Sequence, residues 1–156
     1  MLALARAQIH VSALLLALLG AAGAVFAQDA RPLLDAERHL SMRPLVSSGS
    51  TVLGEPIRYP SGSPAHVTML EIVLTPGQQT GWHTHPVPLA AYVLEGELTV
   101  DYGPKGKRIY RAGDAFIEAV EQPHDGSSTG EGPARLLVVV IGAEGLAASV
   151  PAPPPH

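Results

Sequence analysis

Short apolar runs separated by turn residues fill the chain after Pro64. Most runs end at glycine or proline, and no long helical period separates one from the next. Runs of this length and spacing are typical of strands in an antiparallel barrel or sandwich. The pattern therefore predicts an all-β domain over residues 65–145. Its expected strands are Val67–Leu74, Leu89–Leu94, Leu98–Tyr102, Arg108–Tyr110, Ala115–Ala119 and Ala134–Ile141.

A different pattern opens the chain. Arg6 precedes an apolar run from Val11 to Val25, and small residues lead up to Gln28. A basic start, a short apolar run and small residues at its end are typical of a cleaved secretory signal. The run is short for a membrane span of about 20 residues, so cleavage is favoured over a retained anchor. We predict a signal peptide at residues 1–27 and a periplasmic or secreted location.

Two segments around the expected barrel lack strand patterns. Residues 28–64 are polar and repeatedly interrupted by proline, which predicts an irregular N-terminal arm. Some order is expected near Ile57 to Tyr59, where the arm can cover a sheet edge of its own or of a neighbouring subunit. Residues 146–156 are expected to form a Pro-rich C-terminal tail.

Composition and charge exclude several classes of function. The formal net charge of −4 gives no broad basic surface, so nucleic acid is not expected as a partner. The chain has no cysteine, which excludes disulfides, thiolate metal sites and cysteine nucleophiles. Stability must then come from a buried core, a bound metal or a second subunit, which leaves a homodimer open. No membrane partner is expected after signal cleavage.

The candidate chemistry begins with His83 and His85, which stand two residues apart in an extended-looking run. Side chains two apart on a β-strand point to the same face, so both imidazoles can reach one point. Two histidines at one point most often indicate a metal site. The alternative is a pair of unrelated surface histidines beside a turn.

The residues around this pair follow a known spacing. The first cupin motif reads Gly, five residues, His-x-His, three or four residues, Glu, six residues and Gly. Gly77, His83, His85 and Gly96 occupy their places in it, whereas Leu89 stands where the glutamate belongs.

A second segment matches in part. Gly113 and His124 fall on the second cupin motif, in which Pro, Gly and Asn are replaced by Ala119, Glu121 and Ser128. The chain therefore resembles the small single-domain cupins over roughly Val67 to Gly142. The resemblance implies a double-stranded β-helix, or jelly-roll barrel. It also implies that His124 joins His83 and His85 in holding one divalent ion, with Fe, Mn, Ni and Zn all left open.

Leu89 changes the chemistry that the resemblance implies, because the usual cupin site adds the glutamate to the three histidines. Three neutral imidazoles leave the ion's charge uncompensated, which favours anionic or chelating substrates. They also leave as many as three coordination positions open.

Four other residues could restore the missing ligand by position: Glu71, Gln78, Gln79 and Glu118. Glu118 stands on the strand that leads to His124, and Glu71 lies mid-strand between two apolar residues. An acid in a β-run more often faces solvent. Either carboxylate, if it faces the interior, is a candidate catalytic base beside the metal.

These features predict a metal-dependent cupin that acts on a small anionic or chelating molecule. Oxidoreductase chemistry of the dioxygenase type is placed ahead of isomerase chemistry. The alternatives are a non-catalytic module that holds a small ligand or a metal, and a structural barrel whose histidines are idle.

The export prediction has a direct test. The mature chain is expected to start at or near Gln28, because the small residues of the signal end there. N-terminal sequencing of the protein from its native host measures this, and an intact Met1 in the cytosolic fraction would overturn the predicted location.

Overall fold

The structure, a computed structural model, describes residues 41–156. Arg43–His156 form one unit, and this unit is described below. The predicted signal peptide and the first residues of the N-terminal arm lie outside the described residues.

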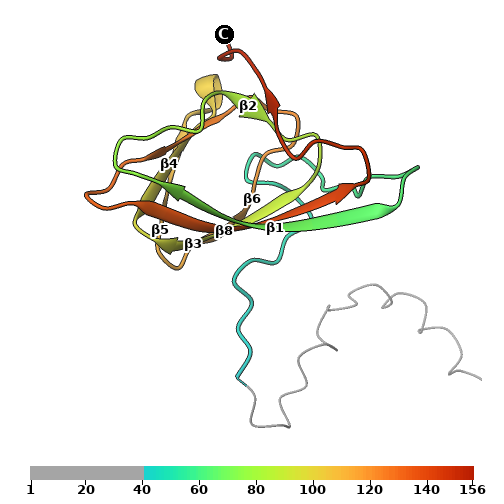
Figure 1. Ribbon diagram of the computed structural model, residues 1–156, viewed down its shortest axis with the longest axis horizontal. Coiled ribbons are helices and arrows are strands. Elements are labelled where there is room, and N and C mark those ends of the chain that lie inside the picture. The colour runs from blue at the N-terminus through green and yellow to red at the C-terminus, as the bar shows by residue number, and fades with distance from the viewer. Residues whose placement is uncertain (1–40) are drawn as a thin grey trace, which may run out of the picture. The chain divides into compact units, whose positions relative to one another are not determined.

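A four-stranded antiparallel sheet forms one side of the unit, with the strand order β1-β8-β3-β6 (Figure 1). β1 and β8 pair along all ten residues of each strand. In β8 the inward residues, such as Leu136 and Val138, are buried, and the residues between them are less so, because side chains alternate across a strand. The strands are β1 (Ala65–Leu74), β3 (Leu89–Glu95), β6 (Ala115–Ile117) and β8 (Ala134–Ala143).

Two smaller sheets complete the barrel. One has the order β5-β4-β7, and the other is the pair β2-β9. Figure 1 shows β2 on the side of the barrel opposite the four-stranded sheet. A short 3-10 helix, η1 (Gly103–Lys105), joins β4 to β5. The strands are β2 (His83–Thr84), β4 (Glu97–Asp101), β5 (Lys107–Arg111), β7 (Asp125–Ser128) and β9 (Val150–Pro151).

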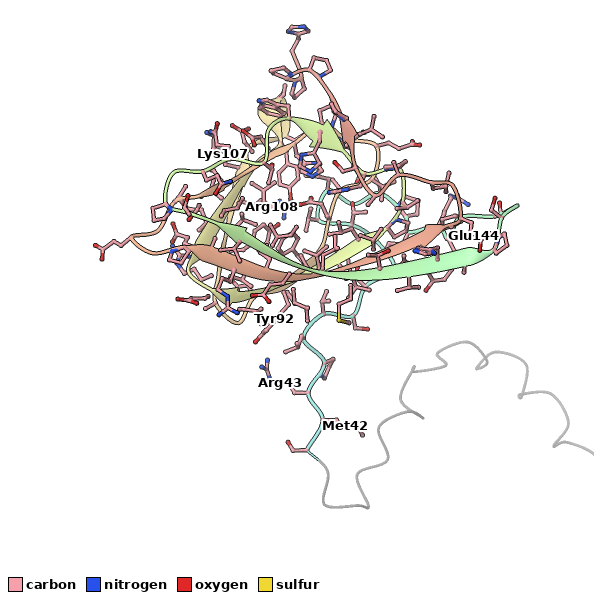
Figure 2. All side chains as sticks on the ribbon, viewed as in Figure 1. Met42, Arg43, Tyr92, Lys107, Arg108 and Glu144 are labelled. Carbon is pink, nitrogen blue, oxygen red and sulfur yellow. The ribbon has the colours of Figure 1, made fainter. Side chains whose placement is uncertain are left out.

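The hydrophobic core lies inside the barrel, where side chains from the four-stranded sheet and from the sheet β5-β4-β7 pack together (Figure 2). Val93 from β3, Val100 from β4 and Phe116 from β6 are all buried in it. Tyr92, whose neighbours in β3 point inward, lies on the outer face of its sheet (Figure 2). Among residues 41–156, no helix is long and apolar enough to cross a membrane.

The predicted all-β fold of the double-stranded β-helix type is confirmed. Each predicted strand is present with its ends shifted by a few residues. The sequence did not indicate β7 or β9, whereas the extended run expected at His83 is the short strand β2. The segment Asp125–Ser128 is polar, yet three of its four residues are buried against neighbouring strands.

Gly96 forms the tight reversal between β3 and β4, as the motif predicts. Its φ of 76° is a conformation that side chains rarely adopt. A Cβ atom there would lie 2.2 Å from the carbonyl oxygen of Pro133, so the backbone leaves no room for one. At the reversal between β5 and β6, Asp114 caps the turn by accepting a hydrogen bond of 2.7 Å from the Arg111 N–H.

The described part of the arm covers the free edge of β6. The Val52 N–H donates to the carbonyl oxygen of Ile117 at 2.9 Å, and Ser50 forms an antiparallel bridge with Pro56. The arm therefore protects an edge of its own barrel. The ordered contacts reach Ile57, whose N–H bonds to the Gly49 carbonyl oxygen, whereas Tyr59 is 74% exposed.

Candidate metal centre

The barrel interior brings together the three histidines of the two motifs. His83 lies in β2, His85 follows that strand, and His124 directly precedes β7. Their ring centroids are 4.5 to 5.0 Å apart, and one nitrogen atom from each ring lies within 4.8 Å of those of the other two. Segments about forty residues apart in the sequence therefore present three imidazoles to one point.

The backbone itself holds two of these residues side by side. His83 and His124 form an antiparallel bridge: the His83 N–H donates to the His124 carbonyl oxygen at 3.0 Å, and the reverse bond is 2.9 Å. Residues directly opposite in such a bridge project their side chains to the same face. The spacing between these two rings is thus set by main-chain geometry.

Each imidazole is also oriented by a hydrogen bond from its Nδ1 atom to a backbone carbonyl oxygen. His83 bonds to Gly81 at 2.7 Å and His124 to Gln122 at 2.8 Å. His85 bonds to Ala148 at 2.6 Å. Because a carbonyl oxygen only accepts, each Nδ1 carries the proton and each Nε2 keeps a free lone pair. This is the arrangement in which metal-binding histidines are usually held.

Burial keeps two of the rings neutral. His85 and His124 are 7% and 2% exposed, respectively. Removal from water lowers the pKa of each to about 4, against the opposing effect of the hydrogen bond to the carbonyl oxygen. Both rings are therefore uncharged at neutral pH, and neutral imidazole is the form that binds metal.

Glu118 faces the same interior. Its side chain is 5% exposed, and its Oε1 atom accepts hydrogen bonds of 2.7 Å from the Tyr102 hydroxyl and the Ala119 N–H. Its Oε2 atom lies 3.9 Å from Nε2 of His124. Burial raises the pKa of the Glu118 carboxyl group. A sequence signal for this orientation existed, since Glu118 stands two residues after Phe116, which packs in the core.

The other candidates for the missing ligand are engaged elsewhere. Glu71 is exposed, and its carboxylate pairs with Arg135 at 2.6 Å. Gln78 is exposed and accepts hydrogen bonds from the backbone and side chain of Thr75. Gln79 is exposed as well. Of the four residues considered, Glu118 alone is buried beside the histidines.

Leu89 lines the cavity that the three histidines face, and it is 7% exposed. The place that holds a glutamate in the usual motif is thus apolar here. The cavity has a volume of about 80 Å³, and its other walls include Val100, Phe116 and Val138. A space of this size holds a metal ion with a few waters or the reactive end of a small molecule.

A wider hollow of about 460 Å³ adjoins this cavity and shares His83 and His85 with it. Trp82, Ala148 and Pro151 line it. Its volume lies in the range of small-molecule pockets, which is roughly 300–1,000 Å³. His83 and His85 therefore lie between the inner cavity and a space that can hold a ligand.

The C-terminal segment contributes to this centre, which the sequence did not indicate. β9 pairs with β2, and the Ala152 N–H donates to the Trp82 carbonyl oxygen at 3.0 Å. Figure 1 shows this segment beside β2. The hydrogen-bond partner of His85 is a main-chain atom of Ala148, so no side-chain pattern could reveal it.

The donor set fits a divalent transition metal. Three neutral imidazoles with free Nε2 atoms suit iron, nickel or zinc. Two ligands of one such ion can be separated by up to about 4.2 Å, so only small ring movements are needed for the three atoms to share it. The donor types leave the choice of metal open.

Comparison with known proteins agrees with this geometry. Residues 70–140 match the family model described as the cupin domain. No curated protein matches the sequence.

Several solved structures are similar to the chain. The DMSP lyase DddQ from Ruegeria pomeroyi is 23% identical, with 66% of this chain and 49% of that chain covered and a TM-score of 0.49. A predicted oxalate decarboxylase from Thermotoga maritima is 26% identical, with 47% and 64% covered and a TM-score of 0.42. The chain thus spans less than two thirds of either protein.

A third similar structure is an uncharacterized protein with a double-stranded beta-helix domain from Klebsiella pneumoniae. It is 24% identical, with 67% of this chain and 99% of that chain covered and a TM-score of 0.47.

Removal of any one of the three imidazoles is expected to remove most of the bound metal. The variants His83→Ala, His85→Ala and His124→Ala should each weaken binding by more than the roughly 10- to 100-fold lost when only a supporting residue is changed. Metal content after dialysis, measured by mass spectrometry, checks this. His66→Ala is the matched control, because His66 is exposed and outside the cluster. Full metal content in His124→Ala would contradict the three-histidine centre.

The metal-free protein is expected to lose stability as the pH falls from about 6.5 to about 4. In that window the unfolded chain protonates His85 and His124, whereas the folded chain keeps both neutral. The free energy of unfolding should fall by a few kcal/mol, since one pKa unit corresponds to about 1.4 kcal/mol. Urea unfolding at pH 7 and pH 4.5 measures it. An equal loss in the double variant His85→Gln/His124→Gln would show that the loss has another source.

Proposed function

Because residues 70–140 of this chain form a cupin domain, we propose that His83, His85 and His124 hold one divalent metal ion that acts on a small molecule. The observation that carries the proposal is the set of three Nδ1 hydrogen bonds to carbonyl oxygens. They leave three Nε2 lone pairs directed at one point. Histidines with a purely structural role in the core do not require this arrangement.

The reaction we propose is an oxidation of the dioxygenase type. A bound ion of a redox metal supplies Lewis acidity and one-electron chemistry. His83, His85 and His124 would hold such an ion and would leave coordination positions open for a chelating substrate and for dioxygen. Because His85 and His124 are uncharged, they do not compensate the positive charge of the metal ion, and this favours an anionic substrate.

The surrounding residues support chemistry on a small substrate. Leu89, Phe116 and Val138 give the inner cavity apolar walls, and an apolar surrounding strengthens electrostatic interactions there. The outer hollow next to Trp82 can hold the remainder of the substrate. A small carboxylic acid with a second oxygen in chelating position has the size and charge that this arrangement accepts.

Export remains part of the proposal, and it rests on the pattern at residues 1–27. The protein then meets its metal and its substrate outside the cytoplasm.

Metal analysis of the protein purified without chelator, followed by oxygen uptake with a panel of small carboxylic and hydroxy acids, tests the function. We expect stoichiometric redox-active metal and uptake that depends on one class of substrate. The variant His85→Ala is the control and should show neither. Stoichiometric metal without turnover of any acid would show that the protein is a binding module and would contradict the proposed oxidation. Absence of metal under varied loading would contradict both.

A further inference from the structure

A carboxylate lies directly across the sheet from Leu89. β3 and β6 are antiparallel, with Ala90 opposite Ile117, and the next pair in this register is Leu89 and Glu118. The Glu118 N–H donates to the Leu89 carbonyl oxygen at 2.9 Å, which continues the ladder to this pair. Opposite residues in an antiparallel pair point to the same face, with their Cβ atoms about 4.5–5.5 Å apart. Glu118 therefore enters the interior beside the place where the motif expects its glutamate.

The two carboxylate oxygens of Glu118 have different surroundings. Oε1 is fixed by the Tyr102 hydroxyl and the Ala119 N–H, both at 2.7 Å. Oε2 accepts no hydrogen bond from the residues that the structure describes, and it lies 3.9 Å from Nε2 of His124. Two ligands of one ion, each about 2.1 Å from it, are at most about 4.2 Å apart. The separation of 3.9 Å is thus compatible with one ion shared by Glu118 and His124. Glu118 lies outside the group of donor atoms that are all within 4.8 Å of one another, so its carboxylate must move closer to the ion that the three histidines share.

The buried negative charge of an ionised Glu118 also favours a cation nearby. The side chain is buried, and within residues 41–156 it forms no ion pair with lysine or arginine. An ionised carboxylate that is buried without a positive partner destabilises the fold. A divalent ion at the three Nε2 atoms would supply the missing charge from the side that Oε2 faces.

We propose that Glu118 is the fourth protein ligand, and that β6 supplies the carboxylate that the usual motif places on β3. The inference rests on the proposed metal site and changes its chemistry. The ion and its ligands carry one net positive charge instead of two, and two coordination positions remain open on an octahedral ion instead of three. Tyr102 is then a positioning residue, since its hydroxyl group turns Oε2 towards the histidines by holding Oε1.

The first test compares Glu118→Gln with the wild-type protein. Glutamine has nearly the same shape but lacks the charge, so the affinity for Co²⁺ or Zn²⁺ in competition with a chelator should fall by at least about 10- to 100-fold. The visible spectrum of the Co²⁺ form should change, because its ligand set changes. The metal-free variant should be no less stable than the wild type. Glu131→Gln is the matched control, since Glu131 is exposed.

The outcomes separate this inference from the proposed function. If the wild-type protein binds no metal, the proposed metal site itself is contradicted. A wild-type site that binds metal, together with an unchanged affinity and Co²⁺ spectrum in Glu118→Gln, would overturn the ligand role of Glu118 alone.

A second test exchanges the two opposite positions. Glu118→Leu should lose metal affinity, and the double variant Leu89→Glu/Glu118→Leu should regain at least about tenfold of it, because either position can present a carboxylate to the same ion. Circular dichroism and thermal unfolding show whether both variants are folded. A folded double variant that binds no more tightly than Glu118→Leu would contradict the proposal.

Discussion

The candidate centre depends on three hydrogen bonds from imidazole Nδ1 atoms to main-chain carbonyl oxygens. Their acceptors belong to Gly81, Gln122 and Ala148, which lie in three separate segments of the chain. Each bond fixes both the orientation of a ring and the nitrogen that carries the proton. The cluster therefore exists only when all three segments are in place, and the C-terminal segment is one of them.

The barrel provides what these bonds require. The antiparallel bridge between His83 and His124 places two rings side by side, and the pairing of β9 with β2 brings the carbonyl oxygen of Ala148 to His85. The apolar core behind the rings removes them from water and keeps His85 and His124 neutral. Three imidazole donors beside one buried carboxylate form an environment that suits a divalent cation. In the centre that we propose, the carboxylate of Glu118 determines the net charge of the site.

Much of the fold was predictable because local pattern and tertiary environment agree. Val67–Leu74 and Ala134–Ile141 are apolar enough to indicate strands, and they form β1 and β8. β7 was missed because Asp125–Ser128 reads as a loop, and its pairing with β4 becomes visible only in three dimensions. The spacing of His83 and His85 pointed to the site, since alternation along an extended chain is a local property.

The remainder of the site depends on contacts that spacing does not encode. The sequence named Glu118 as a candidate, and its spacing of two from Phe116 indicates which face of the strand it occupies only once Phe116 is known to pack in the core. That face is set by the register between β3 and β6, in which Glu118 stands opposite Leu89. The role of Ala148 could not be predicted from the sequence for a different reason, because any residue can provide a carbonyl oxygen. Sequence thus indicated the donors, and the structure adds the carbonyl oxygens that orient them and the buried carboxylate beside them.

The most direct measurement is an anomalous difference map from crystals of the metal-loaded protein, collected at the absorption edge of the metal. We predict one peak per chain, about 2.0–2.2 Å from the Nε2 atoms of His83, His85 and His124. A peak bound to an Nδ1 atom, a peak away from these three residues, or no peak in fully loaded crystals would contradict the account.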